Sequence, residues 1–593
     1  MGSLSYTFLT NFSKSVKLSL MVATGYAISL TTTYIISTFS ISPNKYFFLI
    51  FLCFSLAGVG FSAFRLHDLK VNEWEIHKNT FRNLRNVNNL IFIIPIISIL
   101  APVIIPLTNF MRSGYFEPVF TQGNNDVAQF VLEAEAIIRG GFNGHNFVLN
   151  QNQFIFARDN DFGAPNFILW VSKFDLLKTW QTPTPILSIT NLLLFFGVSG
   201  AICYRFKLSR YKSYAISLLV TSGAVVLYLD SNLFLSQVIS MWLWSNIIIL
   251  FLSVRQSKSK SERRNLLLLI GVNFSGCFFT YPHMAIITFC IYILSVLVLF
   301  FWKRRTEIKN LDDKLGAYIY YPLLVLILMC NIYLGPGLRL FIYRASASNG
   351  WPMPKGLSIA NLLLVADYSG KYQTFFEILS IGLLLFLIEK VFKQTQHKHL
   401  NFEQKIQSLV WVTIPIFLYL TLAILFGVSS YKAWKVLFSF APFILSGFVL
   451  QWLIFMPKRK QKIFWRYLPL GMVLLIIPMV RQYIPIVQNH TLYSQRTTSK
   501  DLYDLNSNSF ISNVNSINVK LNPFFESMYA SSIIQVPNIY INVASYAPIR
   551  IESNTCTLVR NDALNVKSEL GYVHRLNSTY SIINSPSVCQ FKK

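Results

Sequence analysis

Long apolar runs separated by short polar connections dominate the chain as far as about residue 487. A membrane-spanning helix needs about 20 apolar residues, because lipid offers backbone amides and carbonyls no hydrogen-bond partner and only intrahelical bonding satisfies them. About thirteen runs approach this length. They predict spans near residues 17–40, 44–64, 90–111, 183–203, 213–230, 233–254, 265–282, 284–302, 317–336, 374–393, 407–427, 436–456 and 467–487.

The composition agrees with a membrane protein. Hydrophobic residues make up 53% of the 593 positions and charged residues only 13%, and 51 residues are Phe. Soluble domains carry about 25% charged residues. We therefore expect a polytopic α-helical membrane protein with about thirteen transmembrane helices.

The formal charge of +27 raises the possibility of nucleic-acid binding, but the distribution of Lys and Arg indicates membrane topology instead. The basic residues cluster in alternate connections, which by the positive-inside rule face the cytoplasm. This places the N-terminus inside and the C-terminus outside. The basic clusters lie in residues 65–85, 205–212, 255–264, 303–305, 389–405 and 457–462.

Two large segments then face the outside: the connection 112–182 and the tail 488–593. The tail opens with a polar, Ser- and Asn-rich stretch and continues with β-branched runs such as "SIIQVPNIYINVAS". Alternation of this kind favours strands. We expect a small exported C-terminal domain that is α/β or β-rich.

Five of the seven cysteines lie inside apolar runs, where they serve as small core residues. Cys556 and Cys589 are the pair in the exported tail. An oxidising compartment favours a disulfide between them, with two free thiols as the alternative.

The first external segment contains an acidic, amphipathic stretch, "NNDVAQFVLEAEAIIRGGF" (residues 124–142). Steps of 100° per residue gather the apolar side chains in one arc and predict a helix that lies on an apolar surface, either the bilayer interface or the tops of other helices. Glu135 and Arg139 are placed one turn apart in the favourable order. The apolar arc consists of Val127, Phe130, Val131, Ala134, Ile137 and Ile138.

Asp126 is at the start of this helix, and two roles for it are compatible. Asp126 and Gln129 have the spacing of a capping box, in which a short acid accepts from the free amides of the first turn. A carboxylate held in this way also stays ionised and oriented, as a general base must be. Spacing alone leaves the choice between cap and base open.

The same stretch resembles the first external loop of membrane glycosyltransferases with the GT-C fold, such as lipid-A aminoarabinose transferases and protein mannosyltransferases. "GAPNFILW" (163–170) and "TYPHM" (280–284) are similar to further segments of that family. The specific match covers about 60 residues. The residues that carry it in the acidic stretch are Asp126, Phe130, Ala134, Ile137, Gly141 and Phe142.

The resemblance implies a division of the chain. Residues 90–487 would form a GT-C-like transmembrane core with an external catalytic loop at 112–182. In that family the acidic loop usually follows the first span, whereas here it follows the third. Residues 1–89 would therefore be an added N-terminal helical hairpin with a cytoplasmic loop. Many members have Asp-Glu and Tyr where this chain has Asp126-Val127 and Phe130, which bears on the acceptor.

The resemblance also implies an activity: transfer of a sugar, with inversion, from a polyprenyl-phosphate donor to an envelope glycan, lipid or protein acceptor outside the plasma (bacterial inner) membrane. This chemistry needs a general base near the acceptor hydroxyl and cations near the leaving phosphate. Asp126 is the predicted base. Glu117 is the reserve candidate, with a solvated loop acid as its other reading. Neither a cofactor nor a divalent metal is implied, since no ligand cluster has suitable spacing.

Cations on the outer side are costly under the positive-inside rule and therefore informative. Lys432 and Lys435 flank aromatic residues in "SSYKAWK", where an anionic head group would bind. Each such cation can instead be an interfacial residue that extends toward lipid head groups. The candidate phosphate-binding residues are Arg158, His283, Arg339, Arg344, Lys355, Lys371, Lys432 and Lys435.

Two other functions remain open: a transporter or flippase for lipid-linked glycans, and a glycan polymerase. Coupled transporters often show internal repeats and mid-span ionisable residues. This sequence has no evident repeat and few such residues.

Overall fold

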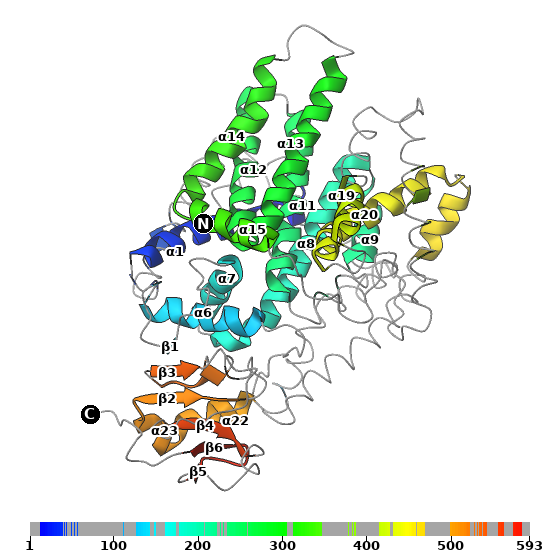
Figure 1. Ribbon diagram of the computed structural model, residues 1–593. Helices are drawn as coiled ribbons and strands as arrows, with labels where there is room; N and C mark the ends of the chain where they lie inside the picture. Colours follow the sequence, from blue (N-terminus) through cyan, green and yellow to red (C-terminus); the bar gives the residue numbers. More distant parts are fainter. Residues whose placement is uncertain are drawn as a thin grey trace.

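The computed structural model describes most of the helical region and parts of the tail (Figure 1). Apart from isolated positions, the predicted spans at 44–64, 90–111, 374–393 and 467–487 lie outside the described residues. The structure describes residues 12–39, 126–140, 142, 148–149, 161–173, 177–206, 208–221, 234–257, 259–304, 312–346, 414–426, 431–457, 459–468, 499–521, 533–536, 538–541, 556–561 and 573–583, and these isolated positions: 41, 43, 49, 52, 53, 56, 111, 226, 229, 378, 382, 385, 386, 389, 527, 530 and 531.

Apolar helices form one layer of the molecule. Three of them are long and apolar enough to cross a membrane, over Ser15–Thr38, Pro183–Cys203 and Leu235–Val254, close to predicted spans. This confirms the membrane character, while the number thirteen stays a prediction. The helices of this layer are α1 (Lys14–Thr38), α8 (Pro183–Phe206), α9 (Arg210–Thr221), α11 (Leu235–Gln256), α12 (Lys260–Thr280), α13 (Pro282–Arg304), α14 (Asp312–Cys330), α15 (Leu334–Ser346), α19 (Ile414–Phe426) and α20 (Tyr431–Phe455).

Helix α11 lies at the centre of the layer, and its apolar window is entirely buried. Small residues let α8 approach it closely, as is common between membrane helices. A Cβ atom on Gly197 would lie 2.9 Å from Ser245 Cβ. A Cβ atom on Gly200 would lie 2.6 Å from Val16 Cγ2 of α1, so α1, α8 and α11 meet at these glycines.

Helix α1 is an integral part of the same core. Ser19 Oγ donates to Asn246 Oδ1 at 2.9 Å and accepts from Trp242 Nε1 at 2.9 Å. Tyr26 OH lies 2.9 Å from Thr280 Oγ1 of α12. An added hairpin would suggest that the first predicted span lies at the periphery. These contacts instead bury it among the other helices. The second half of that hairpin lies outside the described residues.

The helical layer has two distinct ends. At the end that we name the sheet end, the Tyr34 ring of α1 lies 4.9 Å from Phe142, and α6 and the sheet lie beyond it (Figure 1). At the opposite end, the far end, Ser15 Oγ lies 2.9 Å from Tyr214 OH of α9, and Lys212 Nζ lies 5.0 Å from the Trp465 ring centroid. The basic clusters near 205–212 and 457–462 adjoin the far end. The distribution of basic residues predicts that the helix ends near these clusters and those near α6 lie on opposite sides of the membrane. The structure places them at opposite ends of the helical layer. Which end is cytoplasmic stays a prediction.

Most strands of a six-stranded sheet come from the tail, and the strand order is β1-β3-β2-β4-β6-β5. The pairs β1/β3, β3/β2 and β2/β4 are parallel, and β4/β6 and β6/β5 are antiparallel. Helical positions between β2 and β3 make this part α/β. The strands are β1 (Val148–Leu149), β2 (Ser516–Val519), β3 (Asn538–Ile541), β4 (Thr557–Arg560), β5 (Val573–Arg575) and β6 (Tyr580–Ile583).

Strand β1 does not come from the tail. It belongs to the predicted catalytic loop, and Val148 pairs with Ile539 while Leu149 pairs with Tyr540. The loop 112–182 and the tail 488–593 therefore share one sheet instead of forming separate units. Among the described residues of "SIIQVPNIYINVAS", Asn538–Ile541 forms a strand and Ile533 is helical.

Candidate functional site

Helix α6 (Asp126–Gly140) lies across the sheet end of the helical layer (Figure 1). The predicted apolar arc is confirmed: five of its members are buried, and Ile138 is half-buried. Of the side chains predicted to face away, Gln129, Glu135 and Ala136 are half-buried. The helix lies on other parts of the protein, so the prediction of a helix on the tops of other helices holds.

The arc alone does not explain how deeply α6 is buried. Ala128, Leu132 and Glu133 are at most 5% exposed, although they lie beside or outside the predicted arc. Helix α7 (Gly163–Ser172) packs against α6, and the sheet that contains β1 lies on the other side (Figure 1). Helix α6 is therefore packed by α7 and η5 (Thr179–Gln181) and lies between the helical layer and the sheet.

Asp126 is the first helical residue of α6 and is half-buried. A negative charge in the first turn is favoured by the partial positive charge of the helix N-terminus. The predicted capping box needs one correction, because Asp126 lies inside the helix instead of at the position before it. Gln129 Nε2 donates to Glu133 Oε1 at 2.9 Å, one turn further along. Asp126 thus lies in the first turn of α6, where the helix dipole favours a negative charge.

A short 3-10 helix, η5 (Thr179–Gln181), fixes the outward face of α6. Thr179 Oγ1 donates to Glu135 Oε1. Trp180 is buried, and its ring lies 6.1 Å from the ring of Tyr503 in the tail helix α22 (Ser499–Asp504). Helix α6 is therefore tied to the tail domain twice, through η5 and through β1.

The segment "GAPNFILW" forms α7, which packs on α1. A Cβ atom on Gly163 would lie 2.5 Å from Tyr26 OH and 2.6 Å from Thr280 Cα, so only glycine permits this approach. Asn166 Nδ2 donates to Ser29 Oγ at 3.1 Å, and further along Trp170 Nε1 donates to Thr33 Oγ1 at 3.1 Å. This segment therefore holds α6 against the helical layer.

Aromatic side chains fill the space where α1, α12 and the loop meet. The Tyr34 ring lies 5.2 Å from Phe162 and 5.1 Å from Tyr333. Phe279 stacks on Tyr333 with centroids 4.8 Å apart. Tyr34, Phe162 and Tyr333 are at most 1% exposed. Edge-to-face packing of this kind makes a closely packed aromatic cluster next to α6.

The segment "TYPHM" forms the junction between α12 and α13. Pro282 disfavours a helical conformation in Tyr281 and suits the first position of α13, where no amide partner is needed. Tyr281 is buried at this junction. Lys435 Nζ of α20 lies 5.6 Å from the Tyr281 ring centroid, and the His283 ring lies 3.9 Å from it. The structure therefore brings two predicted cations, Lys435 and His283, to one aromatic ring.

A polar side chain from α11 completes this cluster. Gln237 Nε2 lies 3.1 Å from Ser439 Oγ and 3.4 Å from the Lys435 carbonyl, and Gln237 is 3% exposed. We name Gln237, Tyr281, His283 and Lys435 the cation cluster. Sequence reasoning missed Gln237 and Tyr281 as site residues. The available signals were a glutamine near the start of an apolar run and the tyrosine before Pro282.

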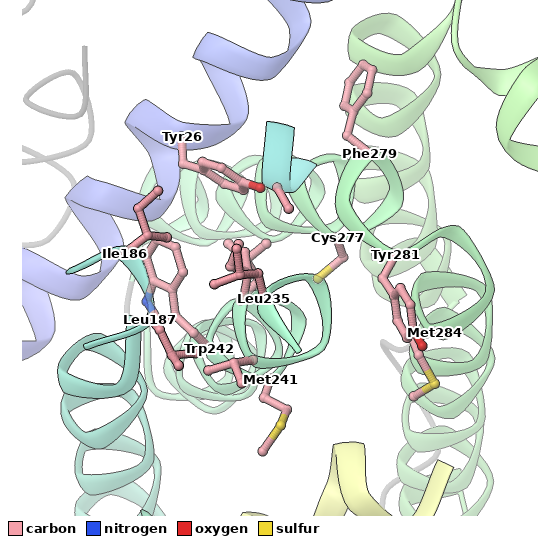
Figure 2. Close-up of a cluster of buried hydrophobic side chains, with 14 of the residues drawn as sticks. Tyr26, Ile186, Leu187, Leu235, Met241, Trp242, Cys277, Phe279, Tyr281 and Met284 are labelled. Atoms are coloured by element: carbon pink, nitrogen blue, oxygen red, sulfur yellow. The ribbon is translucent and has the colours of Figure 1, made fainter. Parts of the chain in front are cut away.

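Next to the cation cluster is a cavity of about 10 Å³. Figure 2 shows Met241, Cys277 and Met284 around this region, and Ser240, Thr288 and Ser439 also line it. This volume holds about one water molecule. This cavity is therefore too small for a sugar or a phosphate.

The other predicted site residues are placed as follows. Arg339 is exposed on α15, and the backbones of Arg344 and Lys432 are helical, in α15 and α20. Glu117, Arg158, Lys355 and Lys371 lie outside the described residues.

The cysteines divide into two groups. Cys556 is buried and disulfide-bonded. Cys53, Cys203, Cys277, Cys290 and Cys330 are free. The predicted partner Cys589 lies outside the described residues, so the pairing itself stays a prediction.

Within the described ranges, no group of three or more His, Cys, Asp and Glu side chains is arranged to hold a metal ion. No protein-family model matches the chain, and no curated protein matches it. The arrangement of residues is therefore the basis for a functional interpretation: an acid at the start of a fixed helix, and a cation cluster at the same end of a membrane helical layer.

Proposed function

We propose that the protein is a membrane glycosyltransferase that moves a sugar from a polyprenyl-phosphate donor to an envelope glycan, lipid or protein acceptor at the outer face of the plasma (bacterial inner) membrane. The N-terminus is cytoplasmic and the tail domain external. The resemblance of the acidic loop to the GT-C family supports this class. The location of the sheet and α6 at the end opposite the basic clusters supports the orientation.

The position of Asp126 is the observation that carries the proposal. It opens a helix that is buried between membrane helices and an α/β sheet, at the end of the layer where a lipid head group and an external acceptor would meet. A base works only if it is held within hydrogen-bond reach of the proton that it removes. The hydrogen bond from Thr179 to Glu135 and the packing of α7 hold α6 in place.

The proposed reaction uses both parts of the site. Asp126 accepts the proton of the acceptor hydroxyl, and the acceptor oxygen forms a bond to the anomeric carbon of the sugar. The bond from that carbon to the phosphate oxygen breaks, and polyprenyl phosphate leaves with the bonding electrons. Attack from the face opposite the leaving group inverts the anomeric carbon. Lys435, and His283 when protonated, stabilise the charge that develops on the phosphate.

Two alternative functions fit the membrane setting, a transporter or flippase and a polymerase of lipid-linked glycans. A transporter needs a substrate path at the bilayer midplane, often with discontinuous helices. Helix α6 lies across the sheet end of the helical layer, which suits chemistry at the membrane surface better than alternating access. A polymerase differs in its acceptor, which is itself a lipid-linked glycan.

The experiment is a donor-consumption assay with full-length protein in lipid nanodiscs. Single polyprenyl-phosphate sugars are offered with envelope extract as acceptor, and release of polyprenyl phosphate is followed by mass spectrometry. We expect one donor to be consumed. If no donor is consumed but the protein moves a fluorescent lipid-linked sugar between vesicle leaflets, the transporter alternative replaces this proposal.

A further inference from the structure

Helix α15 leaves the direction of the membrane helices abruptly. The apolar sequence predicts a single span at 317–336, but α14 ends at Cys330 and α15 begins at Leu334 after a bend of 98°. If α14 crosses the bilayer along the layer, α15 lies nearly in the plane of the membrane. Figure 1 shows α15 across the sheet end of α12 and α13.

One face of α15 is fixed to the protein. A Cβ atom on Gly337 would lie 2.7 Å from the Phe278 ring of α12, so glycine is required for this close approach. Leu340 is 5% exposed on the same side. Pro336 lies in the first turn, where its missing amide costs no hydrogen bond. The sequence "GPG" therefore starts a new helix and seats it against α12.

The other face of α15 is exposed and has an aliphatic strip next to a more polar one. Leu338 and Ile342, one turn apart, are 41% and 63% exposed. Arg339 and Tyr343 form the adjoining strip, and Tyr343 is 62% exposed. An aliphatic strip beside a cation and a tyrosine is the pattern of a helix at a membrane interface, where the apolar side enters the acyl region and the polar side meets head groups.

The exposed aliphatic strip continues onto α14. A soluble surface rarely exposes a contiguous patch of this kind, whereas a membrane helix exposes it to lipid. The exposed apolar side chains of α14 and of the bend are Tyr320, Leu323, Ile327, Leu328 and Ile332.

We propose that α15 is an interfacial helix that binds the outer leaflet of the bilayer, with Leu338 and Ile342 in the acyl region and Arg339 on the phosphates of anionic phospholipids. Three observations carry this assignment: the bend, the continuity with the apolar surface of α14, and the positive charge. Arg339 is thereby assigned to the bilayer instead of to the sugar donor. The inference does not depend on the proposed enzymatic activity.

The depth of α15 can be measured by spin labelling of the full chain in nanodiscs, with the exposed Cys53 and Cys290 replaced by Ser. Labels at Ile342→Cys, Tyr320→Cys and Tyr503→Cys report α15, the middle of α14 and the tail domain. Collision with oxygen and with a water-soluble nickel chelate gives the depth. We expect the label at 342 to lie about 5–10 Å below the head groups and nearer the surface than the label at 320. Chelate access equal to that at 503, or a depth equal to that at 320, would overturn the proposal.

The charge is tested separately. The label at 342 should be less mobile in phosphatidylglycerol than in phosphatidylcholine nanodiscs. Arg339→Gln should abolish this difference, and Arg339→Lys should retain most of it. Lys212→Gln at the far end is the matched control and should leave it unchanged. An equal difference in wild type and Arg339→Gln would contradict the binding of anionic head groups by Arg339.

Discussion

Two amphipathic helices among the described residues, α6 and α15, lie at the sheet end of the helical layer, and they differ in what surrounds them. Helix α6 is enclosed by α7 and the sheet, so that even Glu133 on its polar side is buried. Helix α15 is held on one face by α12 and exposes Leu338 and Ile342 on the other. Similar amphipathicity therefore serves two purposes: one helix positions an acid inside the protein, and the other presents apolar and cationic side chains to lipid.

The comparison shows that an apolar arc does not by itself define a binding surface. The apolar arc of α6 is buried within the protein, and this burial fixes the helix that carries Asp126. The exposed arc of α15 is satisfied by the bilayer. A substitution in the apolar arc of α6 should therefore destabilise the folded protein even in detergent. A substitution in the exposed arc of α15 should instead change how the protein binds lipid.

A charge introduced into each helix should show the largest difference. Val131 of α6 is 0% exposed and Ile342 of α15 is 63% exposed. Val131→Asp buries an unpaired carboxylate and should cost about 3–5 kcal/mol, seen as loss of monodisperse protein in size-exclusion chromatography. Ile342→Asp should remain folded in detergent. Equal loss in both variants would contradict the contrast between an enclosed helix and an exposed one.

The cations of the two regions should also differ. Lys435→Gln removes a charge from the cation cluster and should weaken donor binding by about 1.5–3 kcal/mol, or roughly ten- to hundredfold in KM. Arg339→Gln should leave KM unchanged in detergent, where no bilayer is present. KM is measured from donor consumption. A change in Arg339→Gln as large as that in Lys435→Gln would return Arg339 to the donor site.

Glycines supply a matched pair for packing. A Cβ atom on Gly163 of α7 would meet Tyr26 and Thr280, whereas one on Gly335 of α15 would meet nothing within 4 Å. Gly163→Ala should therefore destabilise by about 1–3 kcal/mol, measured as a lower Tm in detergent. Gly335→Ala should be neutral or slightly stabilising. A Gly163→Ala protein with wild-type Tm would show that α7 does not approach α1 and α12 as described.

The smallest effect is expected at the contact between α6 and η5. Thr179→Val removes the hydroxyl that donates to Glu135 and should cost about 1 kcal/mol. Amide hydrogen exchange, read by mass spectrometry, should accelerate in α6 and stay unchanged in α15. If exchange in α6 does not change, the contact with η5 is not what restrains this helix.

Local pattern was sufficient to predict several parts of the structure. The helix at 126–140 and its buried arc follow from the 3.6-residue period. The break between α12 and α13 follows from Pro282. The three helices that are long and apolar enough to cross a membrane follow from the length of their apolar runs. Loop charge also predicted that the basic clusters near 205–212 and 457–462 lie at the end opposite the sheet.

Long-range features could not be predicted from these patterns. Strand β1 has two residues and pairs with β3 from far along the chain, so no local period signals it. The cation cluster combines α11, the α12–α13 junction and α20, and only packing brings these together. The bend before α15 did have a signal in the sequence, "GPG" at 335–337. It was not predicted, because the apolar run continues through the bend and its length alone indicates a single span.

The central claim is that Asp126 is the general base, and its isosteric amide tests this most directly. Asp126→Asn removes the charge and retains the shape. Glu262→Gln is the matched control, since Glu262 is also a first-turn acid, at the far end of α12. Turnover of the lipid-linked donor is measured in nanodiscs, with Tm recorded for both variants. The account predicts that Asp126→Asn keeps a near-wild-type Tm and loses about 10²- to 10⁴-fold in kcat, while Glu262→Gln loses neither; full turnover by Asp126→Asn would contradict it.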